Sequence, residues 1–194
     1  MRFTLIASAL ALAVGTNAAM SASEVQSNID AITQKSAETK DVAHSITVLN
    51  ALNKGPLVIN DFKDIITLAT NDITAMNSKR SEEAALDSVA ALGSQKKRQS
   101  VGYSAVEQQG ICNAFRSFVE VHQDLLRVVI GKHGILSTFS FTKPIATVLQ
   151  TLEGGVDKLA FGIIDTVPTC AQDATQNKNA LDQTLKDAET TYSN

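Results

Sequence analysis

The chain has 194 residues, of which 44% are hydrophobic and 19% charged, and its formal net charge is −3. A mildly acidic chain in which basic and aromatic residues do not alternate is a poor candidate for binding nucleic acid. The bulk charge also gives no reason to expect electrostatic attraction to a membrane.

The first 19 residues have the layout of a secretory signal peptide. The N-terminus carries a positive charge, residues 3–14 are apolar or small, and residues 15–19 form a small-residue exit, so we expect cleavage after Ala18 or Ala19. A membrane anchor is the alternative, but a span needs ~20 apolar residues and this run is shorter. We therefore expect a secreted, extracellular protein with no transmembrane anchor, folded as a single domain over residues 20–194.

The first helix after this segment is predicted from apolar and small residues that recur at spacings of three and four. Ser23 and Gln26 make a plausible capping box at its start. Lys54-Gly55-Pro56 is expected to end it, because glycine suits a C-cap and proline does not continue a helix. The buried stripe of this helix is Val25, Ile29, Ile32, Ser36, Thr39, Ala43, Ile46 and Leu49.

A second helix is expected to begin near Asn60 or Asp61. Lys79-Arg80 follows it, then a shorter helical stretch over residues 82–92 and a polar loop over residues 93–102. Lys79-Arg80 and Lys97-Arg98 are dibasic pairs, which a processing protease could cleave or which could be ordinary solvated loop residues. The stripe of the second helix is Phe62, Ile66, Ala69, Ile73 and Met76.

Three further helices follow the polar loop. Ser104 and Glu107 form another capping-box pair, and residues 131–134 break the helix that this pair opens. Thr142-Lys143-Pro144 starts the next helix, and Pro168 suits the first turn of the last. The three stripes are Ile111, Phe115, Phe118, His122, Leu125 and Val129; Ile145, Val148, Leu152, Val156, Leu159 and Ile163; and Cys170, Ala174, Leu181, Leu185, Ala188 and Tyr192.

These elements predict an all-α fold, an antiparallel up-down bundle of about five helices with one disulfide. Cys112 and Cys170 are the only cysteines, and in an oxidising compartment an even count indicates a bridge; two free buried thiols are the alternative. Residues 112–131 span ~30 Å of helix and residues 143–165 span ~33 Å. The chain therefore returns to the level of Cys112 as it reaches Cys170, which agrees with a bridge.

The second half of the chain carries a recognisable order of residues. It contains Asp124-Leu125-Leu126, Ile130-Gly131-Lys132, Phe139, Thr142, Val148-Leu149-x-x-Leu152, Pro168 and Ala188-x-x-x-Tyr192. This order resembles the fungal hydrophobic surface binding protein A family, which includes cell-wall galactomannoproteins. The resemblance is clearest over residues 103–192, extends to residues 25–52, and is weakest over residues 79–102.

The resemblance implies a secreted helical bundle that adsorbs to hydrophobic surfaces. Some members of the family are cell-wall antigens, some hold fatty acids in a cavity between helices, and one type is associated with recruiting a polyester-degrading hydrolase. The expected partners are therefore a fatty acid or a hydrophobic surface, and a secreted polyester hydrolase. The family's ligand-site residues do not carry over, because no invariant polar anchor is recognisable in this sequence.

No motif indicates an enzyme, so we predict no catalytic residue, metal or cofactor. His44, His122 and His133 have no metal-ligand spacing, and the sequence has neither a Gly-x-Ser-x-Gly elbow nor a glycine-rich phosphate loop. His122 lies on an apolar stripe, where a hydrogen-bonded core histidine is the more common interpretation and a ligand contact the alternative. His133, in a turn between two glycines, is expected to be exposed.

Gly154, Gly155 and Gly162 lie within one predicted helix, and each costs ~1 kcal/mol relative to alanine. Either a neighbouring helix approaches closely at these positions or a bend opens space there. The interior has no tryptophan and many small residues. It could leave a channel for an acyl chain, or the helices could close up around the small residues.

We therefore predict a non-catalytic binding protein for long-chain fatty acids or hydrophobic surfaces. An internal cavity could bury the lipid, or amphipathic helices could open onto a surface. The alternative function is a structural or antigenic cell-wall mannoprotein, or a secreted effector, without a lipid ligand. The residues predicted to line the cavity are Phe62, Ile66, Phe115, Phe118, Leu152 and Leu159.

Overall fold

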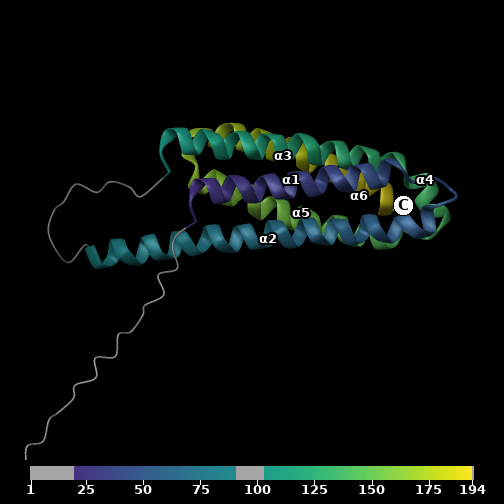
Figure 1. Cartoon of the computed structure of the whole chain (residues 1–194), viewed down its shortest axis with the longest axis horizontal. Helices are drawn as coiled ribbons and strands as arrows, with labels where there is room; N and C mark the ends of the chain where they lie inside the picture. Colours follow the sequence, from purple (N-terminus) through teal and green to yellow (C-terminus); the bar gives the residue numbers. More distant parts are fainter. Residues whose placement is uncertain (1–19, 91–102, 194) are drawn as a thin grey trace, which may run out of the picture.

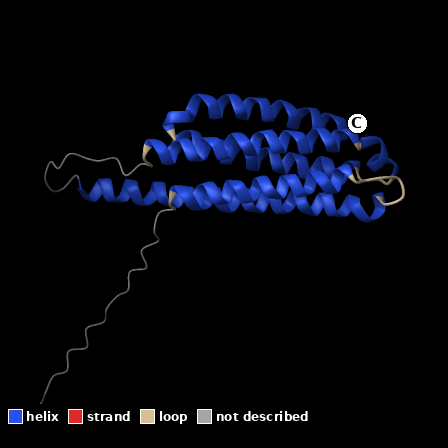
Figure 2. Cartoon of the chain, turned by 45° about the horizontal axis from the view of Figure 1, so that its top comes forward, coloured by secondary structure: helices blue, strands red, loops and turns tan. Residues whose placement is uncertain are grey.

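The computed structural model describes residues 20–90 and 103–193, and gives only the backbone for residues 76–90. These residues form helices and short turns and include no strand, which confirms the all-α class (Figure 2). The predicted signal peptide, the loop over residues 93–102 and the pair Lys97-Arg98 lie outside the described residues. The elements are α1 (Ala22–His44), α2 (Ala51–Ala90), α3 (Ala105–Gly131), α4 (His133–Thr138), α5 (Thr142–Thr166), η1 (Pro168–Cys170) and α6 (Ala171–Ser193).

The long helices of the described part form a closed ring in the order α1, α2, α5, α6 and α3. Figure 1 shows these helices from the side, lying lengthwise along one another. Chain direction alternates along the sequence, as predicted for an up-down bundle. Because the ring order differs from the chain order, only α1/α2 and α5/α6 are antiparallel neighbours. The neighbours α2/α5, α3/α6 and α1/α3 run in the same direction.

Contacts at both ends of α1 and α3 establish their parallel alignment. Near the start of both helices, the Tyr103 hydroxyl donates to the Met20 carbonyl at 3.1 Å. Beyond their ends, the Lys132 ammonium donates to the Ile46 carbonyl at 2.9 Å. The two helices are therefore in register along their whole length.

The first turn of the bundle differs from the sequence prediction. Helix α1 ends at His44 and α2 begins at Ala51, so Lys54-Gly55-Pro56 lies inside α2 and does not end a helix. Asn50 organises the turn, because its side-chain oxygen accepts from the Thr47 N–H at 2.8 Å and its side-chain nitrogen donates to the Ser45 carbonyl at 3.0 Å. The predicted stripe is correct up to buried Ile46, but Leu49 is 97% exposed.

Gly55 and Pro56 are tolerated in α2 for separate reasons. A Cβ at Gly55 would lie 2.6 Å from the Phe141 ring, so glycine there allows Phe141 to approach the helix closely. Proline lacks the N–H that would bond the carbonyl four residues earlier. That carbonyl belongs to Leu52, which is exposed, so water can reach it.

The other predicted helix boundaries are correct only in part. The capping box of α1 is formed by Ser21 and Glu24, and not by Ser23 and Gln26, whereas the predicted pair at the start of α3 is confirmed. The second helix begins at Ala51, nine or ten residues earlier than predicted, and α2 continues without a break past Lys79-Arg80 to Ala90.

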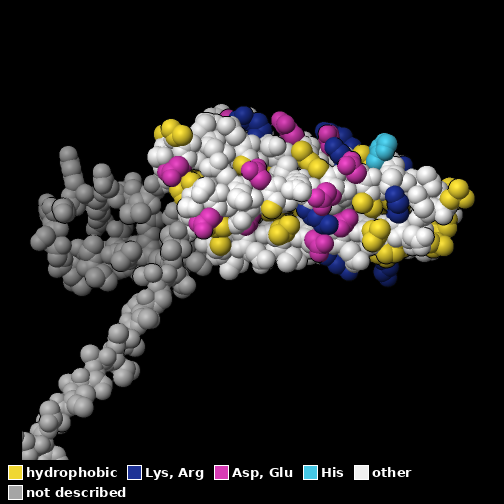
Figure 3. Space-filling model, in the orientation of Figure 1, with side chains coloured by type: hydrophobic (Ala, Val, Ile, Leu, Met, Phe, Trp, Pro, Cys, Tyr) yellow, Lys and Arg dark blue, Asp and Glu magenta, His cyan; other side chains and the backbone are white. Residues whose placement is uncertain are grey.

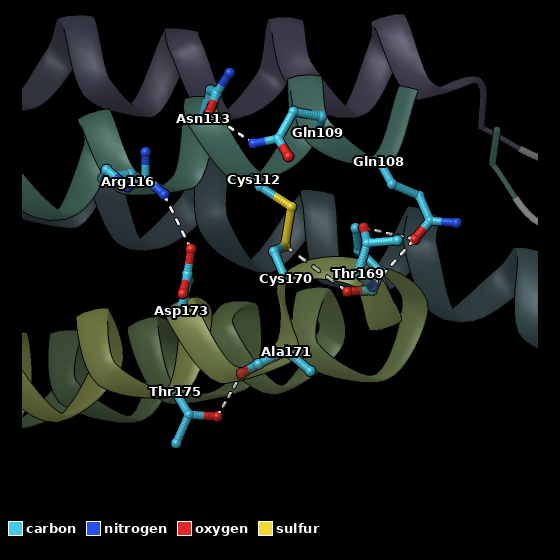
Figure 4. The surroundings of a disulfide bond; sticks show 11 residues. Gln108, Gln109, Cys112, Asn113, Arg116, Thr169, Cys170, Ala171, Asp173 and Thr175 are labelled. Carbon is cyan, nitrogen blue, oxygen red and sulfur yellow. Dashed lines mark hydrogen bonds and ion pairs between the residues drawn. A yellow bond between two sulfur atoms is a disulfide. The ribbon is translucent and has the colours of Figure 1, made fainter. Parts of the chain in front are cut away.

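The predicted stripes of α3, α5 and α6 are confirmed as buried core, and the predicted disulfide is present. Cys112 on α3 and Cys170 in η1 are bridged, with 6.0 Å between their Cα atoms (Figure 4). Beside the bridge, the Thr169 hydroxyl donates to the Gln108 side chain at 2.9 Å. The bridge therefore fixes the start of α6 against the first half of α3.

Candidate functional site

An open groove of about 710 Å³ runs between α2 and α5, the parallel pair of the ring. The residues on each helix recur at spacings of three or four, which places them on one side of that helix. A groove of this volume falls within the usual range for small-molecule sites. Its lining is Ile59, Lys63, Ile66 and Thr67 from α2, and Lys143, Pro144, Thr147, Val148 and Thr151 from α5.

The groove surface is mainly apolar. Val148 is buried, and Ile59 and Ile66 are half-buried against the core. The threonine hydroxyls donate within their own helices: Thr147 to the Lys143 carbonyl at 3.0 Å, and Thr151 to the Thr147 carbonyl at 3.1 Å. Their hydrogens are therefore already used, and the groove offers a ligand few hydrogen-bond donors.

Charge at the groove is of one sign. Lys63 and Lys143 are its charged lining residues, both exposed, and no carboxylate lines it. Lys143 lies in the first turn of α5, whose N-terminus has no side-chain cap. The positive end of the α5 dipole therefore lies at this end of the groove, whereas the N-terminus of α2 lies eight residues before Ile59, its first lining residue. This end is suited to hold an anion such as a carboxylate.

Glycines continue the groove side of α5 beyond Thr151. Gly154 and Gly155 follow Thr151 by three and four residues, so they lie on the same side of the helix. A Cβ added at either glycine would meet nothing within 4 Å, although Gly155 is buried. Close approach by a neighbouring helix, one of the two explanations considered from the sequence, is therefore not the reason for these glycines. The structure has open space beside them.

The structure places the six predicted cavity residues in two different environments. Ile66 lines the groove, whereas the other five are almost completely buried in the core among neighbouring helices. Sequence reasoning did not identify Lys63 or Lys143, because it gave no way to know that α2 and α5 are neighbours. The buried five are Phe62, Phe115, Phe118, Leu152 and Leu159.

His122 is a buried polar residue outside the groove. Its Nδ1 lies 2.9 Å from the Ser36 hydroxyl, and its ring lies 5.2 Å from that of Phe118. Burial lowers the pKa of His122 to about 3, so the ring is neutral at physiological pH. Its Nε2 has no partner among the residues described. The hydrogen-bonded core interpretation is confirmed.

His133 was expected to be exposed, but it is half-buried. Its ring lies edge-on to the Tyr192 ring at 5.0 Å, where α4 meets the end of α6. Within residues 20–90 and 103–193, no cluster of His, Cys, Asp and Glu could hold a metal ion. None of the described helices combines the length and apolarity of a transmembrane span.

No protein-family model matches the chain, and no curated protein matches it. Ligand binding domain 1 of the Penicillium marneffei MP1 protein, solved in complex with arachidonic acids, is similar in structure, with a TM-score of 0.70 and 13% identity over 88% of this chain and 98% of that one. AFMP4P, solved in complex with palmitic acid, gives a TM-score of 0.61 and 12% identity over 88% of this chain and 99% of that one. At these identities the likeness establishes the fold: the chain shares a helical bundle with two proteins that were solved with fatty acids bound.

Proposed function

We propose that the chain is a non-catalytic binding protein whose α2/α5 groove holds a long-chain fatty acid. The acyl chain lies along the apolar floor, and the carboxylate lies at the end that carries Lys143, with Lys63 further along the groove. The observation that carries this proposal is an apolar groove whose two charged lining residues are both lysines. The fatty acids in the two structural neighbours support the same class of ligand.

Secretion, cell-wall association and adsorption to hydrophobic surfaces belong to the same proposal. They rest on the layout of the first 19 residues and on the family resemblance, as does a polyester hydrolase as partner. The six residues predicted from the sequence define an alternative internal site. Five of them would have to move apart to admit a ligand, whereas the groove is already open.

The main test measures binding of a fluorescent fatty acid to delipidated protein. We expect saturable binding that strengthens with acyl length by up to about fourfold per CH₂, the equivalent of ~0.8 kcal/mol per buried methylene. Thr151→Trp fills the groove and should abolish binding. Thr175→Trp is the matched control, because Thr175 is also an exposed helical threonine whose hydroxyl donates four residues back.

The role of the lysines is tested with an uncharged ligand. Lys63→Gln and Lys143→Gln should each weaken binding of the acid by up to about fivefold and leave the methyl ester unaffected. Lys186→Gln, an exposed lysine on α6, is the control. Saturable binding that survives Thr151→Trp would place the ligand inside the bundle. Absence of binding by the unmodified protein would favour the structural or antigenic wall role instead.

A further inference from the structure

The turn between α1 and α2 presents three aliphatic side chains to solvent. Val48 is 62% exposed, Leu49 97% and Leu52 65%. We call these three residues the apolar tip. In Figure 3, hydrophobic side chains gather at the end of the bundle that carries this turn. Adjacent exposed aliphatic residues on a chain that buries most others indicate a surface that meets apolar material.

The tip is held in an ordered turn. Ile46, next to it, is buried, and its carbonyl accepts from the Lys132 ammonium at 2.9 Å. The two side-chain hydrogen bonds of Asn50 fix the backbone on either side of Val48 and Leu49. These contacts hold Val48 and Leu49 away from the core, so an apolar partner would not have to reorder the turn.

The charges around the tip are distributed unevenly. Residues 42–60 and 125–152, which supply the α1/α2 turn, α4 and the adjoining helix ends, contain no Asp or Glu, although the chain has 20 such residues. The same stretches contain Lys54, Lys132 and Lys143. No acidic side chain is visible at this end on the face shown in Figure 3. Among the described residues of α6, Glu189, one turn before the end of that helix, is the acidic side chain nearest this end.

We propose that this end of the bundle docks on a phospholipid bilayer that contains anionic lipids. The apolar tip would insert among the acyl chains, while Lys54 and Lys132 would lie at the level of the anionic headgroups. Repulsion between the acidic remainder of the protein and the same surface would orient the molecule tip first. A second copy of the protein fits this surface less well than a bilayer does, because contact between two tips would bring their lysines together and the like charges would repel.

Docking at this end would also bring the groove to the lipid. Leu52, Pro56, Ile59, Lys63 and Ile66 follow one another on α2 at spacings of four and three, so the tip and the groove wall share one side of the helix. Transfer of a fatty acid from the bilayer to the groove rests on the proposed function, since it takes the groove as the fatty-acid site. In that case the fatty acid would leave the bilayer at the tip.

Vesicle co-flotation tests the docking, with phosphatidylcholine vesicles compared with phosphatidylcholine–phosphatidylserine vesicles. We expect binding to the anionic vesicles, which the combined Val48→Ser, Leu49→Ser and Leu52→Ser variant should reduce at least about tenfold. Val106→Ser is the matched control, because Val106 is an aliphatic residue that is 83% exposed at the start of α3, at the other end of the bundle. A cooperative thermal unfolding transition is required of both variants, as the check that they are folded.

Separate variants test the contribution of charge. Lys54→Gln should weaken binding to the anionic vesicles by roughly fivefold at low salt, and Lys186→Gln should not. Fatty-acid binding in solution is measured on every variant. A tip variant that keeps this binding but no longer floats with vesicles supports docking independently of the groove.

Three results would overturn the docking proposal. The first is that the unmodified protein does not float with anionic vesicles. The second is that the tip variant and Val106→Ser bind these vesicles equally well. The third is that the tip variant converts a dimer into a monomer in size-exclusion chromatography without changing vesicle binding, which would make the tip a self-association surface.

Discussion

Replacing His122 should change how the stability of the protein depends on pH. In an unfolded chain, histidine has a pKa of about 6.5. In the folded protein, burial lowers the pKa of His122 to about 3. Between pH 6.5 and 3 the unfolded chain therefore binds a proton at His122 and the folded protein does not. The free energy of unfolding is at its full value above pH 6.5 and falls as the pH is lowered towards 3. The loss is about 1.4 kcal/mol per pH unit, or about 5 kcal/mol over the whole interval.

The assay is urea denaturation of the protein and of His122→Gln at a series of pH values between about 3 and 8. Glutamine keeps a polar group near Ser36 and does not titrate, so the variant should lose less stability on acidification. Other titratable groups are present in both proteins, so their contributions cancel when one stability–pH curve is subtracted from the other. One of these groups is Asp72, because burial raises its pKa to about 6. Parallel curves between pH 6 and 4 would refute the reasoning and indicate that His122 becomes protonated without unfolding.

Three further predictions concern stability. Gly55→Ala should destabilise the protein by about 1–3 kcal/mol, because the new Cβ would overlap the Phe141 ring, and chemical denaturation measures the loss. Replacing both Cys112 and Cys170 by Ala should lower the free energy of unfolding by about 4 kcal/mol, the chain-entropy value for a sequence separation of 58 residues. An unchanged midpoint of denaturant unfolding would contradict this. Gly155→Ala should stabilise the ligand-free protein by about 0.5–1 kcal/mol, since a methyl group there meets nothing within 4 Å; a loss of stability would show that the space is already occupied.

Periodicity alone was sufficient to predict most of the core. The stripes of α3, α5 and α6 are long, and each keeps its spacing from one helix end to the other, so helix type and buried face followed from them. The bridge between Cys112 and Cys170 was predicted from the even cysteine count, and helix length agreed with it because rise per residue is a fixed property of the α-helix. These features depend on local geometry, which a single sequence specifies well.

The first turn was predicted incorrectly because its determinants are not local. Gly55 and Pro56 resemble a helix end in sequence, but the close approach of Phe141 from a distant segment explains the glycine, and exposure of Leu52 makes the proline tolerable. Side-chain hydrogen bonds of Asn50 then determine where α2 begins. No spacing rule contains that information.

The groove could not be predicted for a related reason. Each wall is visible in the sequence as a stripe of isoleucine, threonine and lysine, but such a stripe is also typical of a solvated helix face. Only the ring order brings Lys63 and Lys143 to one groove. The net charge of −3 likewise gave no indication that one end of the bundle is basic, because a sum over the chain does not describe its distribution.

The disulfide and the groove lie on different contacts of the helix ring. The bridge joins α3 to the start of α6, whereas the groove lies between α2 and α5, which no covalent link and no short loop connects. The bridge therefore does not hold α2 against α5, and the width of the groove depends on side-chain packing. The covalent contribution to stability and the proposed binding site consequently lie in separate parts of the molecule, so loss of the bridge should leave the lining of the groove in place.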